Sequence, residues 1–151
     1  IPGAAKKLKL YTDPNPIFDT YELEMDIARA LNKKVWLPSG GYLVIDQTEA
    51  LTSFDVNTGK FVGKFSLQDT ILKTNLEAVK EIALQLRLRN IGGIIIIDFI
   101  DMEKDSDKHA VVTALEQELK HDKSKINILK INELGLVQIT RKRTSESLEH
   151  K

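Results

Sequence analysis

The feature that constrains the fold most is a run of four isoleucines at residues 94–97, preceded by two glycines and followed by Asp98. An uninterrupted β-branched run is typical of a strand that is covered on both faces. A second acid, Asp101, comes three residues after the first. Because open α/β sheets place their ligand sites at the carboxyl ends of strands, these two carboxylates are the first candidates for chemistry.

Length, charge and composition limit the classes of protein that fit. The chain has 151 residues, enough for one domain, and its 42% hydrophobic and 29% charged residues are typical of a globular protein. The formal net charge is zero, so nucleic-acid binding would depend on local basic patches. The absence of cysteine excludes disulfides, a thiolate nucleophile and Cys-ligated zinc within this segment. No apolar stretch reaches membrane-spanning length.

The order of periodic segments predicts a mixed α/β fold. An N-terminal arm is expected over residues 1–16. Strands are expected at residues 33–37, 42–46, 50–56, 94–98, 126–131 and 136–140. Helices are expected at residues 17–31, at 75–89 after a capping box from Thr74 to Glu77, and to about residue 121 after a cap at Asp105 or Ser106. Residues 57–69 are predicted as a loop near the site. Together these segments predict a largely parallel sheet with an antiparallel hairpin and about three helices.

Two of the predicted strands end in carboxylates, one at Asp55 and one at Asp98. If the helix over residues 75–89 joins these strands as parallel neighbours, the two acids emerge side by side at one sheet edge. Adjacent carboxylates repel each other, and Mg²⁺ removes that cost while it takes water and phosphate oxygens as further ligands. Such a site would hydrolyse a phosphodiester, with Asn57 holding the attacking water or a phosphate oxygen.

The same residues have a second explanation. Asp and Asn are common beyond strand ends because they initiate turns and cap helices, and the pattern alone does not separate this from a metal site. Asp101 is better explained as a turn residue, or as a residue behind the metal ligands, than as a metal ligand itself. The three histidines lack metal-ligand spacing, and the sequence GKFVGKF at residues 59–65 is one residue short of a phosphate-binding loop. Trp36 and Leu37 are predicted to belong to the core.

Six ordered blocks resemble the catalytic subdomain of the ribonuclease E/G family over about residues 11–148. The blocks are VWLPSGGY at residues 35–42, IDQTEAL at 45–51, DVNTG at 55–59, TNLEA at 74–78, QLRLR at 85–89 and IDFIDM at 97–102. The resemblance implies a DNase I-like subdomain, over residues 17–148, of a bacterial cytoplasmic endoribonuclease. It implies cleavage of single-stranded RNA in messenger decay and in ribosomal and transfer RNA maturation.

The resemblance also assigns roles to individual residues. It implies that Asp55 and Asp98 bind the catalytic Mg²⁺, with Mn²⁺ as a second acceptable ion, and that Asn57 takes the family's asparagine role. Lys125 stands where relatives commonly have an arginine that contacts the RNA backbone; the lysine keeps the charge but not the bidentate fork. The sequence departs from the family in the acidic stretch at residues 105–107. The basic residues expected to steer the RNA are Lys125, Arg141 and Arg143.

Several domains and sites that the family's members share are expected outside this segment, which begins Ile1-Pro2-Gly3 without Met. The resemblance implies an OB-fold RNA-binding domain and a 5′-monophosphate pocket before residue 1, and a Cys pair that links protomers through zinc after residue 151. We therefore expect a homo-oligomer for the longer protein and weak or no activity for this chain alone. The alternative is that the isolated piece is a non-catalytic assembly or interaction module. The sequence does not separate an E-type from a G-type member.

Overall fold

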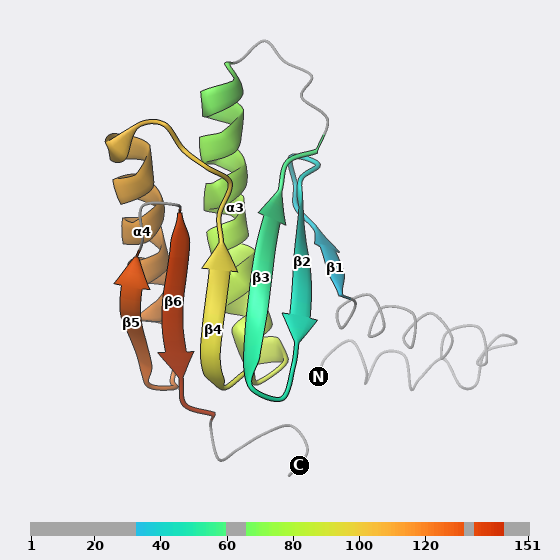
Figure 1. Ribbon diagram of the computed structural model, residues 1–151, viewed down its shortest axis with the longest axis vertical. Helices are drawn as coiled ribbons and strands as arrows, with labels where there is room; N and C mark the ends of the chain where they lie inside the picture. The colour runs from blue at the N-terminus through green and yellow to red at the C-terminus, as the bar shows by residue number, and fades with distance from the viewer. Residues whose placement is uncertain (1–32, 60–65, 132–134, 144–151) are drawn as a thin grey trace, which may run out of the picture. The chain divides into compact units, whose positions relative to one another are not determined.

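The computed structural model describes residues 33–59, 66–131 and 135–143. Within these ranges a six-stranded sheet packs against two helices (Figure 1). The strands are β1 (Lys34–Trp36), β2 (Tyr42–Gln47), β3 (Leu51–Asn57), β4 (Gly93–Asp98), β5 (Ile126–Ile131) and β6 (Leu136–Arg141). The helices are α3 (Leu67–Leu88) and α4 (Asp105–Leu119). The predicted arm at residues 1–16 and helix at residues 17–31 lie outside the described residues.

The sheet has the strand order β1-β2-β3-β4-β6-β5, and β3 with β4 is its single parallel pair among the described strands. The prediction of a largely parallel sheet is therefore wrong. Strands β4 and β5, which α4 connects, do run in the same direction, as expected for a crossover connection. However, β6 lies between β4 and β5 and runs antiparallel to both. The connection through α4 therefore produces no parallel pair, unlike the connection from β3 through α3 to β4. The predicted hairpin of β2 and β3 is confirmed.

Both helices cover the same face of the sheet (Figure 1), so the described residues form two layers. The isoleucines of β4 alternate accordingly: Ile95 and Ile97 are fully buried, whereas Ile94 is 42% exposed. The prediction that this strand is covered on both faces is wrong for the described residues. We call the side opposite the helices the open face. Its side chains include Lys34, Trp36, Tyr42, Val44, Asp55, Asn57, Ile94, Ile96 and Asp98.

Helix α3 begins eight residues earlier than predicted. Ser66 is its N-cap, and the Ser66 Oγ accepts a hydrogen bond from the Asp69 N–H at 3.1 Å. The predicted capping box is wrong, because Thr74 lies inside the helix and is buried. The segment predicted as a loop over residues 57–69 therefore contains the start of α3. The buried residues of the helix are Ile71, Thr74, Asn75, Ala78, Val79, Ile82, Ala83, Gln85 and Leu86.

Helix α4 begins at Asp105, and its N-cap is Lys104, whose side chain makes no capping hydrogen bond. The prediction of a cap at Asp105 or Ser106 is wrong. Asp105 instead lies in the first turn, where a carboxylate is stabilised by the positive end of the helix dipole. Val111, Leu115 and Leu119 recur every four residues and are buried in the core. Neither α3 nor α4 has the length and apolar character needed to cross a bilayer.

Candidate functional site

Asp55 and Asp98 are register partners on the parallel strands β3 and β4. Both residues are exposed on the open face, and Asp98 is the last residue of β4. The pKa of the Asp98 carboxyl is raised, first by partial burial and then by the negative charge of Asp55. The fold thus brings the two acids together at the carboxyl ends of neighbouring parallel strands.

Asn57 ends β3 two residues past Asp55 and lies on the same face. Its Nδ2 donates to the Asp55 Oδ2 and to the Asp55 backbone oxygen, both at 3.3 Å. The amide therefore turns toward the carboxylate and restricts its rotation. The turn before β2 packs closely against this strand end, because a Cβ added at Gly41 would lie 2.7 Å from the Asn57 carbonyl oxygen.

A buried asparagine on α3 holds the chain just past Asp98. The Nδ2 of Asn75 donates to the Ile100 carbonyl oxygen, and the Asn75 Oδ1 accepts from the Ile100 N–H, both at 3.0 Å. Asn75 is 0% exposed. Asn75 was not among the predicted site residues, although a polar side chain four residues after Ile71 and four before Val79 is conspicuous on an apolar helix stripe. Asn75 fixes the backbone that follows the candidate ligand.

The donor set at this edge of the sheet fits Mg²⁺. No three His, Cys, Asp or Glu residues gather into a metal cluster within the described ranges. Mg²⁺ does not need such a cluster, since it commonly takes one or two carboxylates and completes its octahedron with waters and phosphate oxygens. Asp55 and Asp98 match this requirement in number and chemistry. Asp101 is exposed in the irregular segment between β4 and α4, three residues beyond Asp98.

The basic candidates lie at the other end of the sheet. Arg141 pairs with Gly93 at the start of β4, whereas Leu136 pairs with Asp98 at its end. Five residues of strand separate these two rows, which corresponds to roughly 16 Å. Lys125 lies at the same end as Arg141, since its carbonyl oxygen accepts a hydrogen bond from the Lys142 N–H at 3.0 Å. One nucleotide therefore does not reach both the acids and this basic end.

Arg141 is an internal residue, 4% exposed. Its Nε lies 3.0 Å from the Asp122 Oδ2, and its Nη1 donates to the Asn90 Oδ1 and to the Ile91 carbonyl oxygen. Burial raises the pKa of Asp122, but the hydrogen bonds and charge of Arg141, together with the hydrogen bond from the Ser124 N–H, leave that pKa below its usual value. This enclosed guanidinium has no surface to offer an RNA backbone.

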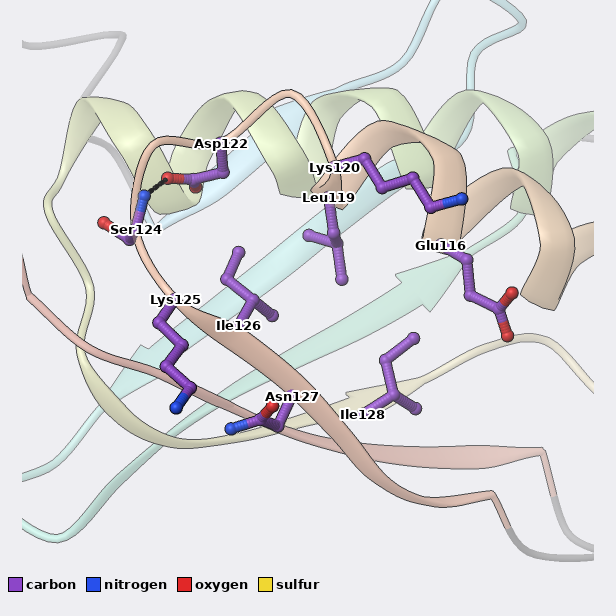
Figure 2. Close-up of a pocket in the computed structure, with 9 residues that line it drawn as sticks. All are labelled: Glu116, Leu119, Lys120, Asp122, Ser124, Lys125, Ile126, Asn127 and Ile128. Atoms are coloured by element: carbon purple, nitrogen blue, oxygen red, sulfur yellow. Dashed lines mark hydrogen bonds between the residues drawn. The ribbon is translucent and has the colours of Figure 1, made fainter.

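A pocket of about 570 Å³ lies between the end of α4 and β5 (Figure 2). Lys120, Lys125 and Glu116 line it, so its charge is mixed. Asp122 also lines the pocket, where its Oδ1 accepts a hydrogen bond from the Ser124 N–H at 2.8 Å. Neither of the two candidate metal ligands is among its lining residues. The pocket is therefore separate from the acidic edge of the sheet.

Comparison with known proteins places the chain in a family. The Ribonuclease E/G family profile matches residues 1–144. The chain belongs to the ribonuclease E/G family. Ribonuclease G of Salmonella typhimurium (strain SL1344) is 57% identical over 150 residues, which are 99% of this chain and 31% of that protein. Ribonuclease E of Escherichia coli (strain K12) is 44% identical over 147 residues, 97% of this chain and 14% of that protein.

Another ribonuclease G, from Haemophilus influenzae, is 54% identical over 150 residues, 99% of this chain and 30% of that protein. The chain thus spans less than a third of the length of these ribonuclease E/G relatives. The family resemblance seen in the six sequence blocks is confirmed by these matches. The two acids and the asparagine that the resemblance singled out occupy one strand-end site in this family member.

Proposed function

We propose that this chain carries the catalytic residues of an endoribonuclease that hydrolyses single-stranded RNA with Mg²⁺ and leaves 5′-phosphate and 3′-hydroxyl ends. The observation that supports it best is the register of Asp55 with Asp98 on parallel strands, in a member of the ribonuclease E/G family. Two carboxylates alone repel a phosphodiester, so a cation between the acids and the substrate is a chemical requirement of this proposal.

Asp55 and Asp98 would hold the ion. When bound, Mg²⁺ supplies activation of a water molecule and stabilisation of the charge that develops on the phosphate. The carboxylates contribute anionic oxygens from two strands whose backbones are fixed by the sheet. Asn57, whose amide already faces Asp55, positions the attacking water or a phosphate oxygen. Because both acids face away from the helices, the scissile phosphate would lie on the open face.

The wider proposal rests on the family match. Messenger, ribosomal and transfer RNA would be substrates of the longer bacterial protein, which would work in the cytoplasm as a homo-oligomer. Lys125 and Arg143 are exposed at the far end of the sheet and would contact the backbone of an RNA several nucleotides long. Arg141 is not part of this proposal, because its guanidinium is buried against Asp122.

A chimeric enzyme tests the catalytic roles. This chain would replace the matching segment of Escherichia coli ribonuclease G, to which it is 56% identical over 150 residues. Asp55→Asn and Asp98→Asn should each lower kcat for RNA cleavage at least about 100-fold, because even residues that only support a metal ligand cost roughly 10- to 100-fold. The control is Asp46→Asn, an exposed carboxylate on β2 whose partner is Lys33 at 2.5 Å. Full activity of either site variant would overturn the assignment.

Magnesium titration of the 151-residue chain, followed by NMR, separates the proposal from its alternative. Chemical shift changes centred on Asp55, Asn57 and Asp98 support the metal site. No change at these residues, together with an inactive chimera, would instead support a non-catalytic interaction module. In that case the acids would serve only the turns that follow β3 and β4.

A further inference from the structure

The one tryptophan of the chain lies on the surface beside the candidate site. Trp36 is 64% exposed, the largest value among the exposed large hydrophobic residues that the structure describes. The prediction that Trp36 and Leu37 are both core residues is half wrong, because only Leu37, at 5% exposed, is buried. Alternation along β1 explains the difference, since neighbouring residues of a strand point to opposite faces. The indole is therefore left on the open face.

Trp36 belongs to a small ordered cluster with Tyr42 and Lys34, which we call the aromatic platform. The Trp36 and Tyr42 ring centroids are 5.3 Å apart, with an interplanar angle of 60°. The Lys34 Nζ lies 4.3 Å from the Trp36 ring centroid and 4.2 Å from that of Tyr42, within the range of a cation–π interaction. These contacts favour this orientation of the exposed indole in the absence of a ligand.

The strand register places the aromatic platform close to the acids. Trp36 pairs with Tyr42, and Tyr42 pairs with Asn57. The next row across the sheet consists of Lys34, Val44, Asp55 and Asp98. Two strand spacings, about 10 Å, therefore separate Trp36 from Asn57. The platform and the acids share one face of the sheet and form one continuous surface.

The positive charge of the aromatic platform itself, that of Lys34, favours an anionic partner at this end of the surface. Among the described residues Lys34 has no ion pair with an acid, whereas the adjacent Lys33 contacts Asp46. An ammonium beside an exposed indole supplies the two elements that bind a single strand without regard to sequence, a ring face for a base and a cation for the backbone. A purely apolar partner would have to bury this charge without compensation.

We propose that Lys34, Trp36 and Tyr42 form a base-stacking subsite for a nucleotide that flanks the phosphodiester held at Asp55 and Asp98. The base stacks on the exposed indole of Trp36, and the Lys34 ammonium contacts a backbone phosphate. Tyr42 keeps the indole in place. This inference rests on the proposed ribonuclease function and adds a substrate-positioning element to it.

Fluorescence provides a direct test, because emission from the sole tryptophan reports only on Trp36. The 151-residue chain would be titrated with a short, single-stranded A/U-rich RNA in EDTA, so that binding is separated from cleavage. Stacking should quench the emission saturably. Lys34→Met should weaken binding and reduce the dependence of log K on log salt by about 0.7, the value for one phosphate contact on a single strand. Lys33→Met is the matched control and should change neither quantity by as much.

Kinetics in the ribonuclease G chimera test the role in the reaction. Trp36→Ala should raise KM about 5- to 100-fold, the range expected for loss of one stacked base, with little change in kcat. Trp36→Phe should recover part of this loss because it keeps a ring. Leu129→Ala removes another exposed apolar side chain, from β5, and should leave KM unchanged. An unchanged urea midpoint for Trp36→Ala excludes a merely structural effect.

The outcomes distinguish the subsite from the function on which it rests. An unquenched Trp36, together with normal cleavage and an unchanged KM for Trp36→Ala, overturns the subsite and leaves the ribonuclease proposal intact. Saturable quenching with no loss of cleavage in Asp98→Asn supports RNA binding at the aromatic platform but overturns the catalytic proposal. An emission that shifts with protein concentration in the absence of RNA shows that a second copy covers the platform, and this also overturns the subsite.

Discussion

Replacing Asn75 by alanine should destabilise the protein at one identifiable place. The change removes both hydrogen bonds to the Ile100 backbone and leaves one N–H and one carbonyl without these partners. An unsatisfied buried polar group costs about 1–3 kcal/mol, so two such groups cost about 2–6 kcal/mol. Because Ile100 is only half-buried, water can reach part of this backbone, and we expect about 2–4 kcal/mol.

Urea unfolding and amide hydrogen exchange measure this loss. With an m-value of about 2 kcal/mol/M, the midpoint should fall by about 1–2 M. The amide of Ile100 should exchange much faster, because its acceptor is gone. The amides in the interior of β4 should exchange faster only in proportion to the loss of global stability. The matched control is Asn127→Ala on β5, where the asparagine is exposed and its loss should cost less than about 0.5 kcal/mol.

The prediction also extends to the site, because the held segment starts two residues after Asp98. Loosening this segment should weaken Mg²⁺ binding in the NMR titration. The titration is run without urea, where the variant is folded. The reasoning is refuted if Asn75→Ala keeps both the wild-type midpoint and the wild-type exchange rate at Ile100. In that event water or another side chain would be satisfying the same backbone groups.

Three further predictions concern charged residues. Arg141→Met should cost about 3–5 kcal/mol in urea unfolding, because it leaves the Asp122 carboxylate, 2% exposed, without its charged partner, whereas Arg143→Met should cost little. The lowered pKa of Asp122 means that its stabilising contribution is present above the unfolded pKa of about 3.9 and is lost as the pH falls through the folded pKa. The raised pKa of Asp98 has the opposite effect on the pH dependence of stability, because the folded state favours the protonated carboxyl. Without divalent ions, the Asp98 carboxyl should contribute a loss of stability as the pH rises from about 3.9 through its folded pKa, and Asp98→Asn should remove this contribution from the pH dependence of the urea midpoint.

The local elements of the sheet were predictable, because their signals lie within short stretches of sequence. The strands at residues 42–47, 51–57, 126–131 and 136–141 match β-rich runs separated by turn residues. The start of α3 was not predictable in the same way. Ser66 is one of several polar residues in a stretch without clear period, whereas Thr74 and Glu77 have capping-box spacing but lie inside the helix. The hydrogen bond from the Asp69 N–H to the Ser66 Oγ identifies the N-cap only once the folded helix is known.

The non-local features were harder to predict. Nothing within β4 or α4 indicates that β6 will take the place beside β4, and this insertion is what makes the sheet mostly antiparallel. The isoleucine run of β4 has the composition of a doubly covered strand, yet Ile94 is exposed among the described residues. Trp36 was misassigned because a three-residue strand gives too short a period to show which of its residues faces the core.

The candidate site was predictable to the extent that it depends on one parallel crossover. Each acid lies between two buried neighbours, Asp55 between Phe54 and Val56, and Asp98 between Ile97 and Phe99. These neighbours fix the strands against the helices, and alternation then turns both carboxylates to the open face. The positions of the acids therefore follow from core packing rather than from a loop, which is how a site on strands achieves precise geometry. The aromatic platform depends on a different pairing, that of β1 with β2, so its place beside the acids could be read only from the folded sheet.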